Sequence, residues 1–233
     1  MGLLETYISR LIPSNMFSET AYSIALLIYV LAVVYATKLV YSILSRRNMP
    51  HNVIVYYNRK IIHVFAGGVV ALLVPIFFTS PLLPMILALA LAIMNWIPHR
   101  TGKLLYWYQV EDNMYEVNFC IAWGLIIAVS WIFFGTPLYG IIPVLFMSFG
   151  DAATGFVRNT LYRKRTKSWW GNLAMFIVCA SISYYYIGLW GIPVAAVASF
   201  IEHYEFNPID DNILISVSTF LLLIILSSLG LIS

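Results

Sequence analysis

The sequence predicts an all-α polytopic membrane protein. Hydrophobic residues make up 61% of the 233 residues and charged residues only 10%, and the mean hydropathy is +0.86. A water-soluble domain normally carries about 25% charged residues. Apolar stretches of about 20 residues, the length that crosses the hydrocarbon core of a bilayer, recur along the chain. These observations predict one helical membrane domain over residues 20–233 and no separate soluble domain.

The start of the chain is expected to be a short interfacial lead over residues 1–19. It lacks the basic segment followed by a long apolar segment that marks a cleavable signal peptide. Its mixed apolar and polar composition, MGLLETYISRLIPSN, is that of an amphipathic segment lying in the membrane interface.

Hydropathy predicts about seven to eight transmembrane helices. The seventh apolar segment, WGIPVAAVASFI, is only about 18 Å long as a helix at 1.5 Å per residue, and it contains Pro193. A helix this short cannot cross alone, so the loop that follows it is expected to sink below the membrane surface. The predicted segments are 20–44, 60–78, 82–98, 117–134, 138–160, 172–187, 189–202 and 213–232.

The charged residues divide the loops into two sets. Twelve of the 13 Lys and Arg residues, eight of the 10 Asp and Glu residues and all four His lie in alternate loops or at their helix ends. The intervening loops TSPLL, FGTPL and YIGLWG carry no charge. The positive-inside rule therefore places the charged set in the cytoplasm and the N-terminus outside. That rule does not explain the acids and histidines, which indicate a site at the cytoplasmic face.

The first polar cluster, YYNRKIIHVFAGG at residues 56–68, enters the second predicted span. Arg59, His63 and Gly67 follow at intervals of four residues, which places them on one helical face. One interpretation is membrane anchoring by Arg59 and Lys60, with His63 in an interhelical hydrogen bond. The functional interpretation has Arg59 and Lys60 binding phosphate while His63 orients a group or relays a proton.

The second cluster lies inside the apolar run VLFMSFGDAATGFVRN, residues 144–159. In a helix one face carries a polar stripe, made of Asp151, Thr154, Gly155 and Arg158. An Asp in mid-span costs about 2.5–3.5 kcal/mol on the insertion scale, so it needs a cationic partner. Either Arg158 supplies that charge, or Asp151 is a Mg²⁺ ligand, because a hard dication prefers carboxylate oxygen. Gly150 and Gly155 would leave the backbone bare for a phosphate.

A basic loop, YRKRTKSWWGN at residues 162–172, follows this span directly. Its basic residues, counted from the end of the preceding span, are Arg158, Arg163, Lys164, Arg165 and Lys167. Such a loop is commonly a topology signal or a lip that attracts anionic lipid. Beside Asp151 it would also supply the cationic clamp that a metal-bound nucleoside triphosphate requires.

The fourth cluster, IEHYEFNPIDDN at residues 201–212, places four acids, one histidine and two asparagines between two spans. The positive-inside rule concerns only Lys and Arg, so it does not explain why acids gather in this loop. Metal coordination and anchoring of the basic loop are both open, as is a solvated turn stopped by Pro208.

Several classes of function are disfavoured by what the chain lacks. It contains no GxxxxGK[ST], GxGxxG, HExxH or GxSxG motif, so phosphoryl transfer would not use a P-loop or a protein-kinase lobe. A net charge of +3 is too small to indicate nucleic acid. Cys120 and Cys179 fall in apolar segments without metal-type spacing. A transporter or flippase is the non-enzyme alternative, but it would place charges in both sets of loops.

In this order, the clusters resemble the dolichol kinase family of integral membrane, CTP-dependent lipid kinases, which includes polyprenol, phytol and CTP-using diacylglycerol kinases. The match runs from residue 59 to 212. Trp170 stands where the family motif has Glu, which leaves a noncatalytic member as an alternative. The matching residues are Arg59, Lys60, His63, Gly150, Asp151, Ala152, Ala153, Lys167, Ser168, Gly171, Glu202, Asp211 and Asn212.

The resemblance implies Mg²⁺-dependent transfer of the terminal phosphoryl of CTP to the hydroxyl of a membrane polyprenol or dolichol-type alcohol. A lipid cytidylyltransferase that makes a CDP-lipid and a CTP-dependent diacylglycerol kinase are the alternatives. Catalytic roles are expected for Asp151, His63 and Lys167, and Mg²⁺ ligation for Asp151 and Asp211. Glu202 and Asn212 are further family-matching positions. The nucleotide is expected at Arg59, Lys60, Gly150, Thr154, Gly155, Lys164, Ser168 and Gly171.

Two further expectations concern context and mutation. The small size favours the cell membrane of a prokaryote, with the endoplasmic reticulum as the location in a eukaryote; the oligomeric state is not predicted. Asp151→Asn is expected to abolish turnover while leaving expression and folding near normal.

Overall fold

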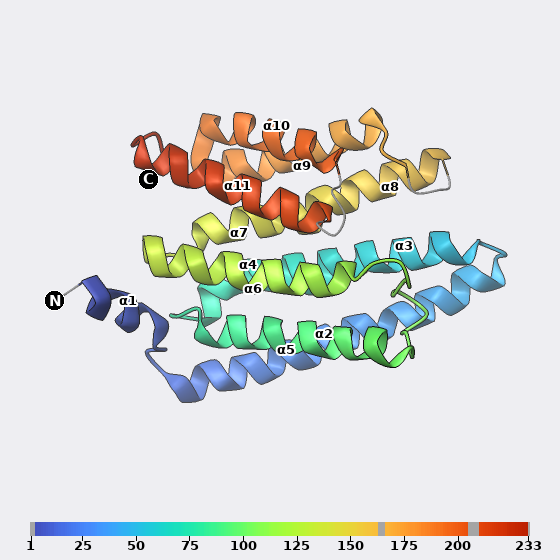
Figure 1. The fold of residues 1–233 in the computed structure, drawn as a ribbon, viewed down its shortest axis with the longest axis horizontal. Coiled ribbons are helices and arrows are strands. Elements are labelled where there is room, and N and C mark those ends of the chain that lie inside the picture. Colours follow the sequence, from blue (N-terminus) through green and yellow to red (C-terminus); the bar gives the residue numbers. More distant parts are fainter. Residues whose placement is uncertain (1–2, 163–165, 205–209, 233) are drawn as a thin grey trace.

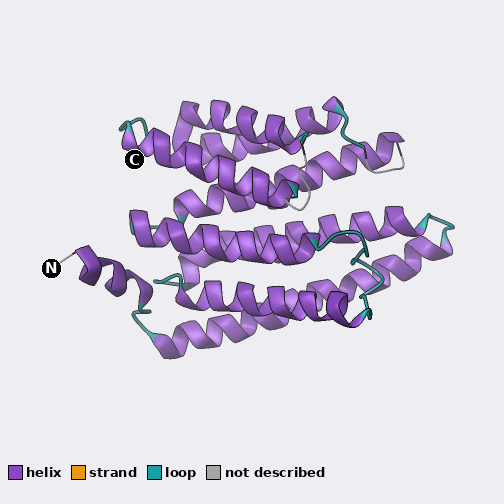
Figure 2. Cartoon of the chain, viewed as in Figure 1, coloured by secondary structure: helices purple, strands orange, loops and turns teal. Residues whose placement is uncertain are grey.

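The computed structural model describes residues 3–162, 166–204 and 210–232. Nearly all of this part of the chain is helical, and it contains no strand (Figures 1 and 2). The helices lie side by side in one elongated bundle, and the N- and C-terminal ends lie toward the same end of it (Figure 1). The predicted all-α fold class is therefore confirmed.

The helices follow the apolar runs of the sequence. Their most buried residues, among them Ile141, Phe146, Met175 and Val194, form a core between the middle and C-terminal helices. In chain order the elements are α1 Leu3–Leu11, α2 Met16–Arg46, α3 His51–Ile62, η1 His63–Gly68, α4 Val69–Phe77, α5 Leu82–Thr101, α6 Tyr115–Phe134, α7 Leu138–Leu145, η2 Phe146–Gly150, α8 Asp151–Tyr162, α9 Trp169–Ile187, η3 Gly188–Trp190, α10 Gly191–Glu202 and α11 Asp211–Ser228.

Seven helical segments of the described chain are long and apolar enough to cross a membrane, as expected for a polytopic membrane protein. One of them, Trp169–Glu202, is folded back on itself. Gly188 has φ +61°, a left-handed conformation that favours glycine, and it separates α9 from α10. Asn172 Nδ2 then donates to the Ser199 carbonyl at 2.5 Å, so the two ends of this segment meet. The break falls where the sequence separates the sixth and seventh apolar runs.

Most helices extend beyond the limits that hydropathy predicts. The second spanning segment begins at His51 rather than at residue 60, and the first begins at Met16 rather than at residue 20. Hydropathy registers only the apolar part of a helix, whereas backbone hydrogen bonding continues through the polar residues at its ends. As a result the basic pair Arg59–Lys60 lies well inside a helix.

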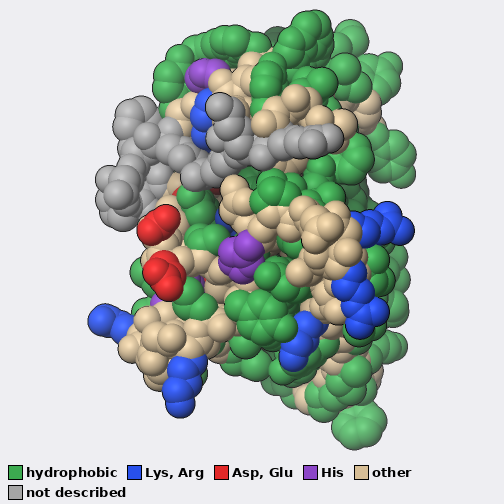
Figure 3. All heavy atoms as spheres, turned by 90° about the vertical axis from the view of Figure 1, so that its right-hand side faces the viewer, with side chains coloured by type: hydrophobic (Ala, Val, Ile, Leu, Met, Phe, Trp, Pro, Cys, Tyr) green, Lys and Arg blue, Asp and Glu red, His purple; other side chains and the backbone are tan. Residues whose placement is uncertain are grey.

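The two ends of the bundle differ in charge. The connections at the right of Figure 1 join α2 to α3 and α5 to α6, and the C-terminal end of α8 lies toward the same side. This end presents acidic, basic and histidine side chains among apolar ones (Figure 3). The opposite connections, at residues 78–81, 135–137 and 188–190, are short and uncharged. The alternation of charged and uncharged loops along the sequence is thus an alternation between two ends of the molecule.

Two π-helical segments interrupt long helices next to the predicted site. η1 separates α3 from α4, and η2 separates α7 from α8; the two segments lie against each other. A π-helical turn holds more residues than an α-helical turn, so it rotates the side chains that follow, and such segments are frequent at functional sites. His63 is the first residue of η1, and Asp151 directly follows η2.

The predicted lead at the N-terminus contains a separate short helix, α1. Arg10 from this helix donates through Nη1 to the carbonyls of Ile132, at 2.5 Å, and Phe133, at 2.9 Å. These carbonyls belong to the last turn of α6. Carbonyls at a helix end have no partner within the helix and favour a nearby cation. The single basic residue outside the charged set of loops thus stabilises a helix end.

Candidate functional site

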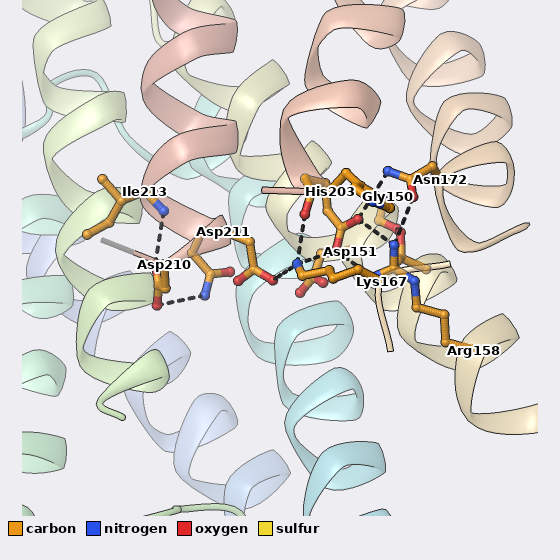
Figure 4. A network of polar contacts seen from close by, with 12 residues as sticks. Gly150, Asp151, Arg158, Lys167, Asn172, His203, Asp210, Asp211 and Ile213 are labelled. Atoms are coloured by element: carbon orange, nitrogen blue, oxygen red, sulfur yellow. Dashed lines mark hydrogen bonds and ion pairs between the residues drawn. The ribbon is translucent and has the colours of Figure 1, made fainter. Parts of the chain in front are cut away.

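The predicted charged residues converge at the charged end of the bundle, where α3, α8, α9, α10 and α11 meet. Figure 4 shows them as one network of polar contacts. The labelled residues come from the end of η2, from α8, from the segment before α9, from the start of α9 and from the two ends of the α10–α11 connection. Those labelled that bear charge or polarity are Asp151, Arg158, Lys167, Asn172, His203, Asp210 and Asp211.

Asp151 lies fully inside the protein and is paired with α3. Lys60 Nζ donates to Asp151 Oδ2 at 2.5 Å, and His63 Nδ1 lies 3.3 Å from the same oxygen. Lys60 and His63 are three residues apart on one helical face, so a single helix supplies both contacts. Only 8% of the Lys60 side chain and 2% of the Asp151 side chain are exposed. The cation that the buried aspartate requires is therefore Lys60, and Arg158, the partner considered from the sequence, is engaged elsewhere.

Aromatic rings of α6 pack against Arg59 of α3 and His63 of η1. The His63 ring stacks on Phe119 of α6 at 4.2 Å between centroids, and the Arg59 guanidinium lies 3.9 Å from the centroid of Tyr115. A charged guanidinium over an aromatic face is attracted by the ring quadrupole. Arg59 Nε nevertheless has no hydrogen-bond partner and is buried. This donor could be satisfied by an anion.

Gly155 leaves the space that the Lys60 side chain occupies. A side chain at Gly155 would meet Lys60 Cε at 2.6 Å and the Tyr56 ring at 2.9 Å. Lys60 Nζ itself lies 4.9 Å from the centroid of that ring. Gly155 is therefore required by close packing of α8 on α3, which brings the lysine to Asp151.

A second ion pair connects α8 with α10. Arg158 donates to both carboxylate oxygens of Glu202 at 2.8 Å, and its Nη2 also donates to Asn172 Oδ1 at 2.9 Å. Bidentate pairs of this kind are short and directional. Both side chains are almost wholly buried. Gly171 packs directly against the Arg158 side chain, and the Ser168 carbonyl accepts from it.

Lys167 links Glu202 to Asp211. Its Nζ donates to the Glu202 carbonyl at 2.7 Å, to Glu202 Oε1 at 3.1 Å and to Asp211 Oδ2 at 3.3 Å. Asp211 is the first residue of α11, and 24% of the Lys167 side chain is exposed. The lysine is the more accessible partner in this network, so it can contact both the buried acids and a molecule arriving from outside.

The three carboxylates form a donor set that suits a hard divalent cation. One oxygen each of Asp151, Glu202 and Asp211 lies within 4.8 Å of the others, and all three residues are buried. Carboxylate oxygen is the ligand that Mg²⁺ prefers, and a few carboxylates with waters and phosphates complete its shell. Lys60, Arg158 and Lys167 form ion pairs with these carboxylates and compensate their negative charges. The two predicted ligands, Asp151 and Asp211, therefore lie close enough to hold Mg²⁺ together, and Glu202 adds a third carboxylate that was not predicted as a ligand.

Asp210 shapes the start of α11. Its Oδ1 accepts from the Ile213 backbone N–H at 3.2 Å, which makes it the N-cap, and its Oδ2 accepts from Asn118 and Asn212. Burial, together with the adjacent charge of Asp211, raises the pKa of Asp210 to about 6. Asn212 Oδ1 is buried and has no partner.

His203 lies at the edge of the site and packs against the start of α9. Its ring stacks on Trp169 with 4.3 Å between centroids, and Nδ1 lies 3.3 Å from Asn172 Oδ1. Partial desolvation, together with the positive charges of Arg158 and Lys167, lowers the pKa of His203 below its ordinary value. This shift favours the neutral imidazole.

The remaining predicted nucleotide-binding residues have structural contacts. The Thr154 hydroxyl donates to the Gly150 carbonyl at 3.1 Å, and Gly150 packs against Cys179 and Met175 of α9. Ser168 is the residue before α9. These contacts explain why small residues occur at these positions, and their nucleotide contacts stay predictions. Lys164 lies outside the described residues.

A second polar network was not anticipated from the sequence. Glu116 Oε1 accepts from His99 Nε2 at 2.6 Å and from Gln109 Nε2 at 2.8 Å. Tyr108 donates to Asn95 Oδ1 at 2.7 Å, and desolvation raises the pKa of Tyr108 above its ordinary value. The sequence shows Glu116 next to the start of a predicted span, which is the one sign of this network. Its partners lie in α5 and in the connection from α5 to α6, so the sequence does not reveal them.

Two apolar hollows reach this end of the bundle. A groove of about 660 Å³ runs between α3 and α8 and is lined by apolar side chains and Lys60; we call it the α3–α8 groove. A narrower cavity of about 110 Å³ lies between α2, α4, α5 and α6; we call it the α2–α6 cavity. Its polar lining includes His63 and Glu116.

Comparison with known proteins gave no match to a family model, to a curated protein or to a solved structure.

Proposed function

We propose that the protein is a CTP-dependent lipid kinase that phosphorylates the hydroxyl of a polyprenol or dolichol-type alcohol in the membrane. The observation that supports this most is the cluster of Asp151, Glu202 and Asp211. Three buried carboxylates with mutually close oxygens lie among Lys60, Arg158 and Lys167, beside hollows suited to a lipid tail. Phosphoryl transfer requires this combination of hard oxygen ligands, cations and an acceptor site.

The nucleotide would approach from the charged end of the bundle. Asp151 and Asp211, with Glu202, would hold Mg²⁺, which neutralises the charge of the triphosphate when bound. Lys167 is partly exposed and would contact the phosphates from the open side. Arg59, whose buried Nε lacks a partner, would donate from the α3 side. Lys60 would place a third cation beside Asp151.

The acceptor hydroxyl would lie near Asp151 and His63. In the reaction its oxygen attacks the terminal phosphorus of CTP, and the bond from this phosphorus to the bridging oxygen breaks. CDP leaves with the electron pair, and the hydroxyl proton passes to a protein base. Asp151 and His63, 3.3 Å apart, are both candidates for this base.

The motif order supports the same reaction. The residues shared with the dolichol kinase pattern include Lys60, Asp151, Lys167, Glu202 and Asp211, and in the fold they contact one another in pairs. Residues that are far apart in sequence but meet at one point are what a shared active site requires. The membrane orientation belongs to this proposal too: by the positive-inside rule, the basic connections support a site at the cytoplasmic face.

A transporter or flippase fits the distribution of buried acids less well. Glu19 accepts hydrogen bonds from Thr79 at the end opposite the site. The other buried acids of the described chain gather at the charged end: Glu116, Asp151, Glu202, Asp210 and Asp211. A transport path needs polar groups reachable from both ends.

Product analysis tests the proposal against its nearest rivals. Purified protein would be incubated with CTP labelled in the terminal phosphate, Mg²⁺ and a panel of polyprenols, geranylgeraniol and diacylglycerol. A lipid kinase yields CDP and a labelled lipid monophosphate, with diacylglycerol as the acceptor if the diacylglycerol-kinase alternative holds. With a lipid monophosphate such as phosphatidic acid added to the panel, a cytidylyltransferase yields labelled pyrophosphate and a CDP-lipid. Absence of labelled lipid with every acceptor would reject the kinase.

A further inference from the structure

The α2–α6 cavity has a distinct polar end and apolar end. Leu87 and Val74, from α5 and α4, line the part toward the uncharged end of the bundle. His63 and Glu116 line the part toward the charged end, and they come from η1 and α6. Its volume of about 110 Å³ is smaller than that of most sites that hold a whole ligand, so it suits the polar group and the first carbons of a molecule with an apolar chain and a polar group at one end only.

At the polar end, Asn95, Tyr108 and one oxygen of Glu116 already have hydrogen-bond partners. Asn95 Nδ2 donates to the Leu91 carbonyl at 2.9 Å, and the Tyr108 hydroxyl donates to Asn95 Oδ1. Glu116 Oε1 likewise accepts two bonds, from His99 and Gln109. Glu116 Oε2, by contrast, is buried and has no donor. An unsatisfied carboxylate oxygen in the interior is costly, so a ligand that donates a hydrogen bond to it would be favoured.

This pattern distinguishes between kinds of lipid. A hydroxyl is a donor and would satisfy Glu116. The ester carbonyls of a diacylglycerol are acceptors, so they cannot satisfy Glu116 Oε2, which is itself an acceptor. Placing unpaired ester carbonyls in an apolar cavity is unfavourable. The cavity therefore suits an apolar alcohol without ester groups.

We infer that the α2–α6 cavity binds the acceptor as a single-chain lipid alcohol, with its hydroxyl donating to Glu116 beside His63 and its chain extending toward Leu87. This inference rests on the proposed function for the identity of the acceptor, and it adds the binding site and a positioning residue. His63 is adjacent to Asp151, so a hydroxyl bound there lies one side chain from the carboxylate cluster.

The test uses photolabelling without nucleotide, so that it does not depend on turnover. A photoreactive geranylgeraniol analogue would be bound to the full-length protein in nanodiscs, irradiated, and its adducts located by mass spectrometry. We expect adducts on α2, α4, α5 and α6. Adducts mainly on the α3–α8 groove would overturn the inference. Equal labelling by photoreactive diacylglycerol or phosphatidylcholine would also overturn it, because the cavity would then hold bulk lipid only.

Matched bulky substitutions in the α2–α6 cavity and the α3–α8 groove show which of the two hollows binds the lipid probe. Leu87→Trp narrows the α2–α6 cavity, and Leu44→Trp narrows the α3–α8 groove. We expect at least a tenfold loss of labelling for Leu87→Trp and no change for Leu44→Trp. Leu27→Trp, on α2, replaces Leu87→Trp if that variant does not fold. The opposite ranking of the cavity and groove variants would overturn the inference.

Glu116→Gln tests the positioning role of Glu116. The wild type should prefer the alcohol probe over its methyl ether by about tenfold, the effect of one hydrogen bond to a charged group. Glu116→Gln should reduce this preference to near unity while the labelled helices stay the same. An unchanged preference would refute the role of Glu116. Labelling of the cavity in a protein that transfers no phosphate would reject the proposed function and leave the lipid site standing.

Discussion

The ion pair of Lys60 and Asp151 allows stability and activity to be separated experimentally. Asp151→Asn leaves the Lys60 ammonium buried, with 8% of its side chain exposed, beside a neutral amide. Removing one partner of a buried pair typically costs about 3–5 kcal/mol, because the other charge stays uncompensated. We therefore expect Asp151→Asn to lower the free energy of unfolding by about that amount, and not to leave folding near normal. Turnover should be abolished as well.

The double variant Lys60→Met, Asp151→Asn identifies the cause. Replacing both partners of a buried pair by neutral side chains is often close to neutral for stability, so most of the lost stability should return. Turnover should stay absent, since the carboxylate is still missing. Lys103→Met, at an exposed lysine on the same end of the bundle, is the control and should change stability by less than about 0.5 kcal/mol.

Both quantities can be measured on the same preparations. Denaturant titration in detergent gives the free energy of unfolding, and transfer of label from CTP to geranylgeraniol gives turnover. The reasoning is refuted if Asp151→Asn is as stable as the wild type, because the buried pair would then be absent. It is equally refuted if the double variant regains turnover, because Asp151 would then have only a structural role.

Three further variants test other parts of the site. Glu202→Gln should lower the free energy of unfolding by about 2–4 kcal/mol, since Arg158 loses a charged bidentate partner; an unchanged denaturation midpoint would contradict this. Asp210 has a folded pKa of about 6, above the ordinary 3.8, so its protonated form stabilises the fold. This contribution, up to about 3 kcal/mol, is fully present below pH 3.8 and is lost as the pH rises through 6. Asp210→Asn should flatten that part of the stability–pH curve, and a curve of unchanged slope would argue against it. Gly155→Ala should cut turnover at least tenfold, because its Cβ displaces Lys60; wild-type turnover would show that the lysine has room to move.

The sequence predicts the fold well because membrane helices are specified by local composition. The separation of the sixth and seventh apolar runs, for example, coincides with the turn at Gly188. Helix ends are predicted less well, since polar residues such as Arg59 continue a helix that hydropathy no longer registers. The π-helical segments η1 and η2 leave no signal in the hydrophobic pattern.

The sequence predicts which charged residues lie close together but not how they pair. The order of charged clusters singles out Lys60, Asp151, Lys167 and Asp211, and these do meet. Arg158 is seven residues from Asp151 and looks like its partner, yet it pairs with Glu202, which lies 44 residues away. Long-range pairing depends on how helices pack, which spacing within one helix cannot reveal.

The proposed function requires that Asp151, Glu202 and Asp211 form a metal site for a nucleoside triphosphate. Electron paramagnetic resonance of Mn²⁺, titrated into the protein with a non-hydrolysable CTP analogue, tests this most directly. We predict a bound Mn²⁺ with magnetic coupling to phosphorus in the wild type, and loss of this bound ion in Asp151→Asn and Asp211→Asn. The absence of bound Mn²⁺ in the wild type, or binding that both substitutions leave intact, would contradict the claim.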